Sequence, residues 1–115
     1  MAKHHDIGRK GELIAFSFLI QHKHKVLEMN WRYQKAEVDL ISIDQGVLVF
    51  TEVKTRSSAK FGNPYEFVSA KKQLLYQDAA EAFLSEKQLD LEIRFDIISI
   101  LLLDQPKIEH FQNAF

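Results

Sequence analysis

The chain has 115 residues, which is the size of one ordinary domain and too short for two. Its content of 46% hydrophobic and 27% charged residues is typical of a globular protein with a buried core, and the absence of cysteine excludes disulfides and thiolate zinc sites. The net charge of -1 gives no overall preference for nucleic acid, although residues 1–77 carry 12 basic and 8 acidic side chains, whereas residues 78–115 carry 3 and 8.

The N-terminal third of the chain predicts a helix and then a strand. Apolar residues at Leu13, Phe16 and Ile20 recur at helical spacing, which predicts a helix over residues 9–23. The run that follows, residues 26–33, predicts a β-strand.

The clearest local pattern is a β-hairpin. Residues 37–43 and 47–54 are rich in β-branched residues, and they flank a short turn that contains Gly46. Both faces of these strands are largely apolar, which predicts a sheet that is covered on both sides rather than washed by water on one.

The second half predicts a loop, a helix and two strands. Residues 55–65 are polar and contain Gly62 and Pro64, which indicates a loop. The elements expected after it are a helix from the N-cap Ser69 to about residue 87, a strand over residues 94–103 and a last strand over residues 108–111. The order α-β-β-β-α-β-β predicts one α/β domain over residues 1–115, with a mixed β-sheet.

The hairpin places two carboxylates opposite each other if its loop has two residues. In that register Asp44 pairs with Val47, and Asp39 lies directly across from Glu52, with Cβ atoms roughly 4.5–5.5 Å apart. Lys54 is on the same face, two residues beyond Glu52. A three-residue loop is the alternative, and a slip of one residue would send one carboxylate to the opposite face of the sheet.

Opposed carboxylates on an apolar sheet face need a compensating charge. A divalent cation such as Mg²⁺ is one candidate, because it is typically held by one or two carboxylates plus waters and phosphate oxygens. The alternative is that Lys54 neutralises the pair in a structural salt bridge. Glu12 favours a site, since it shares an inward helix face with Phe16, although a capping or helix-dipole role also fits it.

Two runs, EVDLI at residues 37–41 and VFTEVKTR at residues 49–56, resemble the D…ExK core of the PD-(D/E)XK nuclease superfamily. The wider pattern is similar to the YraN-like family of small, uncharacterised bacterial proteins, which are related to archaeal Holliday-junction resolvases. Further motifs of this likeness span nearly the whole chain: GRKGE at residues 8–12, NWR at 30–32, FG at 61–62, KQ at 72–73, RFD at 94–96 and NAF at 113–115.

The resemblance implies a restriction-endonuclease-like core, with helices on both faces of the sheet, and a metal-dependent nuclease site. The metal, Mg²⁺ or Mn²⁺, would be held by Asp39, Glu52, Glu12 and the backbone carbonyl of Val53. Lys54 would activate the attacking water or stabilise charge in the transition state, and Gln73 would be an auxiliary polar residue from the second helix.

Basic residues near the predicted site are candidates for phosphate contacts, which give affinity without sequence preference. They are Arg9, Lys10, Arg56, Lys60, Lys71 and Lys72. Each of them also fits as a solvated surface cation. The expected function is metal-dependent endonucleolytic hydrolysis of DNA phosphodiester bonds, with branched or structured DNA as one substrate class.

Two other functions stay open at this point. One is a nucleic-acid-binding module without catalysis, which uses the same basic surface around a relict acidic site; the other is a structural or partner-binding protein. No apolar stretch is long enough for a signal core or a bilayer span, so we expect a cytoplasmic protein with no membrane partner. By analogy with resolvases, a homodimer is a further expectation.

Overall fold

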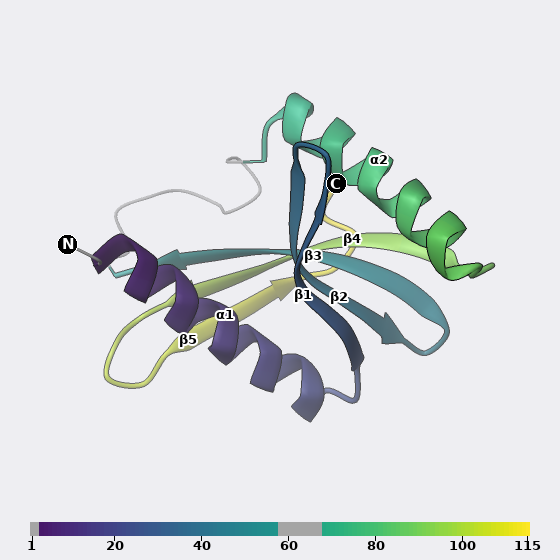
Figure 1. The fold of residues 1–115 in the computed structure, drawn as a ribbon. Coiled ribbons are helices and arrows are strands. Elements are labelled where there is room, and N and C mark those ends of the chain that lie inside the picture. Colours follow the sequence, from purple (N-terminus) through teal and green to yellow (C-terminus); the bar gives the residue numbers. More distant parts are fainter. Residues whose placement is uncertain (1–2, 58–67) are drawn as a thin grey trace.

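In the part of the chain that the computed structural model describes, residues 3–57 and 68–115, five β-strands form one mixed sheet between two helices (Figure 1). The elements are α1 (Lys3–Gln21), β1 (Lys25–Tyr33), β2 (Ala36–Asp44), β3 (Val47–Arg56), α2 (Ala70–Lys87), β4 (Glu92–Leu101) and β5 (Lys107–Phe111). The strands lie in the order β1-β2-β3-β4-β5, and only β3 and β4 are parallel. Helix α2 is the crossover that a parallel pair requires. Neither described helix has the length and apolar character needed to cross a membrane.

The predicted order of elements and the α/β class are confirmed, and the mixed sheet with a helix on each face is consistent with a restriction-endonuclease-like core. The first helix begins earlier than the predicted residue 9, and Asp6 in its first turn suits the positive end of the helix dipole. It ends at Gln21, two residues before the predicted end. There Lys23 adopts a left-handed φ of 68°, and the N–H of His24 donates to the carbonyl of Leu19 at 2.9 Å.

Helix α2 has the N-cap that the sequence predicted. The hydroxyl of Ser69 accepts a hydrogen bond of 3.1 Å from the backbone N–H of Lys72. At the other end Gln88 has a left-handed φ of 54°, and the N–H of Leu89 donates to the carbonyl of Leu84. Both ends of α2 are therefore fixed by local hydrogen bonds, which sets the position of its first turn.

Each face of the sheet is buried by one helix. The α2 face holds the larger cluster, whose buried members are Ala36, Val38, Ile41, Leu48, Phe50, Tyr76, Ala79, Ala80 and Phe83. The α1 face holds Ala15, Leu19, Leu40, Ile98 and Ile100. The expected burial of both sheet faces is confirmed, and it explains why the strand sequences are apolar on both sides.

The β1–β2 hairpin changes face in its middle. Met29 pairs with Leu40 and Trp31 with Val38, so Asn30 and Asp39 lie opposite each other between these pairs. Asn30 has a left-handed φ of 52°. Residues two apart on a regular strand share a face, yet Leu40 packs with α1 and Val38 with α2. The strands therefore twist sharply at Asn30 and Asp39, and the hairpin tip rises beside α2 (Figure 1).

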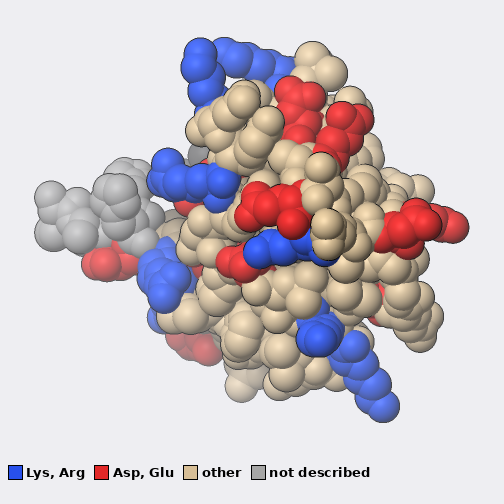
Figure 2. Space-filling model, turned by 45° about the vertical axis from the view of Figure 1, so that its right-hand side comes forward, with Lys and Arg blue, Asp and Glu red and all other residues tan. Residues whose placement is uncertain are grey.

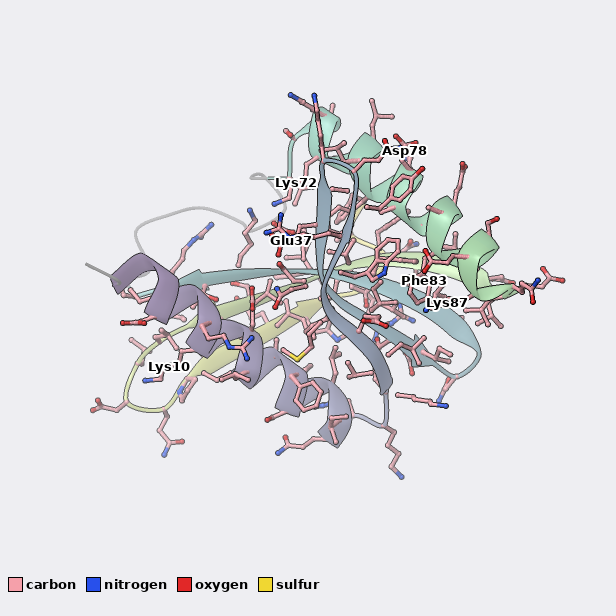
Figure 3. The ribbon with its side chains drawn as sticks, viewed as in Figure 1. Lys10, Glu37, Lys72, Asp78, Phe83 and Lys87 are labelled. Atoms are coloured by element: carbon pink, nitrogen blue, oxygen red, sulfur yellow. The ribbon has the colours of Figure 1, made fainter. Side chains whose placement is uncertain are left out.

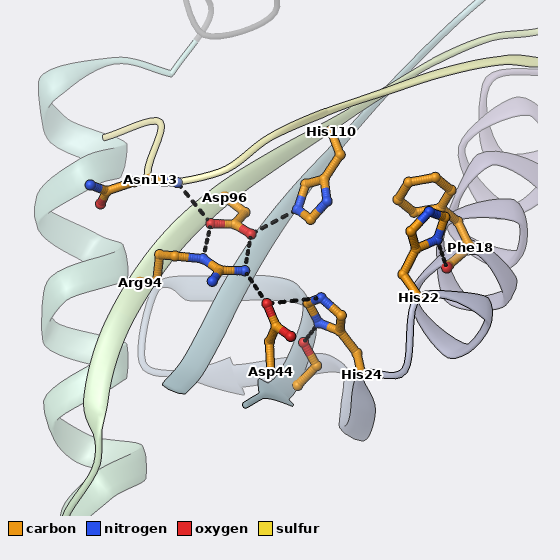
Figure 4. Close-up of polar contacts among 9 residues, drawn as sticks. Phe18, His22, His24, Asp44, Arg94, Asp96, His110 and Asn113 are labelled. Carbon is orange, nitrogen blue, oxygen red and sulfur yellow. Dashed lines mark hydrogen bonds and ion pairs between the residues drawn. The ribbon is translucent and has the colours of Figure 1, made fainter. Parts of the chain in front are cut away.

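A buried polar network ties the C-terminal strands to the end of β2 (Figure 4). Asp96, whose side chain is fully buried, accepts hydrogen bonds of 2.9 Å from Nε of Arg94 and of 3.0 Å from the N–H of Asn113. Arg94 also contacts Asp44 at 3.1 Å, and Nε2 of His110 lies 2.7 Å from the Asp96 carboxylate. The network anchors the final segment of the chain to β4.

Candidate functional site

The turn between β2 and β3 has the predicted register. Asp44 pairs with Val47 and Leu40 with Thr51. The turn residues Gln45 and Gly46 have φ angles of 50° and 82°, and two successive positive φ values are the signature of a two-residue type I′ turn. The prediction of a two-residue loop is confirmed.

Regular pairing ends just before the two carboxylates. Leu40–Thr51 is the last registered pair of β2 and β3, so the predicted direct pairing of Asp39 with Glu52 is wrong in detail. Instead, Oδ2 of Asp39 accepts a hydrogen bond of 2.7 Å from the backbone N–H of Val53. The side chain takes this N–H because β2 bends away from β3 to follow the β1–β2 hairpin.

Asp39 and Glu52 nevertheless face one cavity. Its volume is about 300 Å³, and it lies between the β1–β2 hairpin and the N-terminal half of α2. Its charged lining residues are Lys35, Glu37, Asp39, Glu52, Lys71 and Lys72. Figure 3 shows Glu37 on the hairpin side of this region and Lys72 on the α2 side. The carboxylates of two neighbouring strands are therefore brought to the same side of the sheet, as the register predicted.

Glu52 is surrounded by donors. The hydroxyl of Tyr76 donates to Oε1 at 2.6 Å, and Nζ of Lys54 lies 3.2 Å from Oε2. Nζ of Lys72 also contacts Oε2. The Glu52 side chain is only 5% exposed, so these three donors replace the water that it loses on folding.

The two carboxylates have opposite pKa shifts. Burial and the charge of Glu52 raise the pKa of Asp39 to about 7, against the effect of the Val53 hydrogen bond. Burial alone would also raise the pKa of Glu52, but the hydrogen bonds from Lys72 and Tyr76 outweigh it and lower that pKa below its usual range. The cavity therefore holds one firmly ionised carboxylate and one that is close to half-protonated at neutral pH.

Glu12 approaches the pair from α1. A Cβ built on its neighbour Gly11 would lie 1.8 Å from Oγ1 of Thr55, so glycine lets α1 pack this closely against β3. The charge of Glu12 adds to the raised pKa of Asp39, and its carboxylate lies 3.9 Å from the guanidinium of Arg9. Within residues 3–57 and 68–115, no three His, Cys, Asp or Glu side chains form a group that could hold a metal ion. Glu12 is thus a neighbour of the pair and is not assembled with it.

Gln73, predicted as an auxiliary site residue, lies in the first turn of α2 with its amide directed elsewhere. Its Nε2 donates to the backbone carbonyl of Val68 at 3.1 Å, and its own N–H donates to the carbonyl of Ser69. Gln73 does not line the cavity. Its catalytic role stays a prediction, and the structure gives it a local role in ordering the entry to α2.

The predicted phosphate-binding cations do not form one group. Lys71 and Lys72 line the cavity, and Arg56 lies at the end of β3, two residues beyond Lys54. Arg9 is exposed on α1. Lys10 lines a different groove along α1, and Figure 3 shows it far from Lys72.

Lys60 lies outside the described residues. On the face of the molecule shown in Figure 2, basic and acidic side chains are interspersed, without a continuous basic patch. The positive charge at the cavity is therefore local, from Lys35 on the β1–β2 hairpin, Lys71 and Lys72 in the first turn of α2, and Lys54 beside Glu52.

Tyr76 is a site residue that the sequence pattern assigned to the core alone. It is 1% exposed and packs among core aromatics, yet its hydroxyl reaches Glu52. The spacing held a signal: Tyr76 follows Lys72 by four residues, so both side chains share one face of α2. The same spacing could have shown that Lys72 faces the carboxylates and not only solvent.

The residues present fit a divalent cation of the Mg²⁺ class. The cavity offers carboxylate oxygens and no sulfur or imidazole among its lining residues, which is the donor chemistry that hard cations prefer. Burial and the charge of Glu52 raise the pKa of Asp39, so a cation bound beside it would favour its ionised form. Such an ion would be held by Asp39 and Glu52, with waters or phosphate oxygens completing its shell.

Comparison with known proteins identifies relatives along the full chain. A family model described as "Uncharacterised protein family UPF0102" matches residues 11–100. A UPF0102 protein of Christiangramia forsetii is 46% identical over 116 residues, covering 100% of this chain and 98% of that protein, and one of Flavobacterium psychrophilum has the same identity and coverage. One of Geobacter metallireducens is 43% identical over 111 residues, with 95% and 91% covered. The chain therefore belongs to the uncharacterised protein family UPF0102, which is the YraN family.

Proposed function

We propose that the chain is a metal-dependent endonuclease that hydrolyses DNA phosphodiester bonds. One observation carries this proposal: Asp39 and Glu52, from neighbouring strands, share a cavity in which burial and the charge of Glu52 raise the pKa of Asp39. Lysines from two elements surround the same cavity, so it offers acidic ligands for a cation and ammonium groups for a phosphate. Membership of the family supports this reading only through the resemblance of its D…ExK pattern to known nucleases.

Residues of the cavity would have distinct roles in this reaction. A bound Mg²⁺ or Mn²⁺ would polarise a phosphoryl oxygen and lower the pKa of a water molecule. Asp39 and Glu52 would hold this ion, with the Val53 carbonyl as a further ligand. Lys54, which lies 3.2 Å from Glu52, would place positive charge where the phosphorane builds negative charge. Lys71, in the first turn of α2, would orient a neighbouring phosphate.

The likeness to junction resolvases extends this proposal to branched or structured DNA. Cleavage of a symmetric four-way junction takes two active sites, so a homodimer belongs to the same proposal. Neither feature affects the chemistry of one site, and the choice of DNA substrate tests the first of them.

A cleavage assay tests the proposed activity. Wild type is incubated with single-stranded, duplex, flapped and four-way DNA in Mg²⁺, Mn²⁺ or EDTA. We expect metal-dependent cleavage of at least one substrate, and a loss of about 10²-fold or more in Lys54→Met and in Glu52→Gln. Lys107→Met, on the exposed start of β5, is the matched control and should cleave like wild type.

A non-catalytic nucleic-acid-binding module is the second candidate, and the saturated contacts of Glu52 favour it. Both oxygens of this carboxylate already have donors from the chain, as in a structural salt bridge. In that case DNA would bind equally well to wild type and to Asp39→Asn, and no substrate would be cleaved in any metal. A gel-shift titration run beside the cleavage assay separates the two functions.

A further inference from the structure

The donors around Glu52 compete with a metal ion for its two oxygens. Tyr76 occupies Oε1, and Lys54 and Lys72 share Oε2. A magnesium ion needs to approach a carboxylate oxygen to about 2.0–2.1 Å, and two ammonium groups on Oε2 oppose that approach by size and by charge. A carboxylate oxygen has two acceptor positions, so the departure of one ammonium group from Oε2 opens a position for the ion while the other ammonium group stays.

The three donors differ in how easily they can leave. Tyr76 is 1% exposed and packs among aromatic side chains. Its ring centroid lies 5.5 Å from that of Phe115 and 6.3 Å from that of Phe95. The Lys54 side chain is 22% exposed and projects from the middle of the sheet, whereas that of Lys72 is 38% exposed at the mouth of the cavity. Lys72 is therefore the donor that can move outward without opening the core.

Lys72 also stands in an electrostatically unfavourable place. It is the third residue after the N-cap Ser69, in the first turn of α2, where the helix dipole and the adjacent Lys71 both repel a cation. The contact with Glu52 offsets this repulsion. A metal ion on Glu52 would neutralise the negative charge that Lys72 now contacts. A phosphate at the mouth of the cavity would offer Lys72 a new negative partner.

We propose, on the basis of the nuclease function proposed above, that Lys72 is a built-in counter-ion that blocks the metal site and is released by the phosphodiester substrate. In the free protein its ammonium group takes the place of the cation on Glu52. When a DNA phosphate reaches the cavity, Lys72 moves to that phosphate and Oε2 of Glu52 becomes accessible. Metal and phosphodiester therefore bind cooperatively, and the free protein holds metal weakly.

Binding of Mn²⁺, measured by electron paramagnetic resonance of the free ion, tests this exchange without using activity. Lys72→Met keeps the apolar stem and removes the charge, and Lys72→Gln serves as a second variant of different packing. We expect both to bind Mn²⁺ about tenfold or more tightly than wild type. Lys107→Met, which removes a charge from the exposed start of β5, should stay within about twofold of wild type.

A second titration tests the cooperativity. A thymidine tetranucleotide should tighten Mn²⁺ binding to wild type but not to Lys72→Met, after subtraction of the Mn²⁺ that the oligonucleotide binds alone. The matched tetranucleotide with neutral methylphosphonate linkages should have no effect on wild type, because it offers no charge to Lys72.

The outcomes separate the exchange from the nuclease function. If Mn²⁺ binds with equal affinity to wild type and both Lys72 variants, and Asp39→Asn abolishes this binding, the exchange is wrong and the metal site stands. If no protein shows binding that depends on Asp39, both proposals are wrong. Circular dichroism of each variant confirms that the compared proteins are folded.

Discussion

The hydroxyl of Tyr76 donates a hydrogen bond of 2.6 Å to Oε1 of Glu52, and both residues are almost completely buried. Burial and the charge of Glu52 raise the pKa of Tyr76 well above its usual value, so the phenol keeps its proton and remains a donor at neutral pH. The bond joins the core under α2 to the carboxylate cavity, and it fixes the orientation of a candidate metal ligand.

Tyr76→Phe should destabilise the fold and leave the core volume unchanged. The variant deprives a buried carboxylate oxygen of its donor, which costs about 1–3 kcal/mol. Urea unfolding at pH 7 measures the difference. Tyr33→Phe is the control, because the Tyr33 hydroxyl only accepts an exposed hydrogen bond of 3.3 Å from Gln34, and its change should stay within about 0.5 kcal/mol. Equal stability of wild type and Tyr76→Phe would contradict the role given to this bond.

Asp39→Asn should stabilise the metal-free protein at alkaline pH. Folded Asp39 keeps its proton up to a pKa of about 7, whereas the unfolded chain loses it near pH 4. The free energy of unfolding therefore falls between about pH 4 and pH 7, because the native state binds the additional proton. The asparagine variant does not titrate, so its free energy of unfolding lacks this fall. Its amide oxygen can still accept the hydrogen bond from the Val53 N–H.

At pH 8 in EDTA we expect Asp39→Asn to be more stable than wild type by about 2–4 kcal/mol. The difference should vanish near pH 4, where wild-type Asp39 is protonated in both states. Denaturant titrations from pH 4 to pH 8 provide the measurement. A variant that is less stable than wild type at pH 8 would show that ionisation of Asp39 does not destabilise the folded protein. Mg²⁺ should narrow the gap at pH 8 by stabilising only wild type.

Gly11→Ala and Gly8→Ala should have opposite effects although both lie in α1. A Cβ at Gly11 would meet Thr55 at 1.8 Å, so α1 must shift away from β3, at a cost of about 1–3 kcal/mol. A Cβ at Gly8 would have no atom within 4 Å, so alanine there gains about 0.5–1 kcal/mol of stability from its higher helix propensity. Thermal unfolding of the two variants compares them directly. A stable Gly11→Ala protein would show that α1 does not need this close approach.

Asp96→Asn should be strongly destabilising because Asp96 is the hub of the network in Figure 4. The substitution leaves the half-buried Arg94 with Asp44 as its remaining acidic partner, and breaking an ion pair of the buried Asp96 in this way costs about 3 kcal/mol. Asp90→Asn, at an exposed position, is the control and should change stability by less than about 0.5 kcal/mol.

The loss of stability in Asp96→Asn should depend on pH. Burial would raise the pKa of Asp96, but the hydrogen bonds from His110, Arg94 and Asn113 outweigh it and lower the pKa. The stability that Asp96 contributes is therefore complete above pH 4 and is lost as the pH falls through the lowered pKa. Unfolding titrations should show the gap between wild type and variant closing below pH 4, and a gap that widens there would contradict this sign.

The sequence by itself determined the elements that depend on neighbours along the chain. The periodicity of apolar residues predicted both helices, the Gln45-Gly46 turn predicted the β2–β3 register, and the Ser69 hydroxyl predicted the start of α2. These features follow from local rules of backbone conformation and capping, so they can be predicted without knowledge of the fold. The same register brought Asp39 and Glu52 to one side of the sheet.

Only the tertiary structure decided what those carboxylates contact. The twist at Asn30 breaks the pairing of Asp39 with Glu52, and the packing of α2 on the sheet brings Lys72 and Tyr76 to Glu52. Pairing strength and pKa depend on distances and burial between segments far apart in sequence, which no local pattern contains. The candidate ligands were thus predictable as residues, whereas their charge state and their partners arise from the way α2 crosses the sheet.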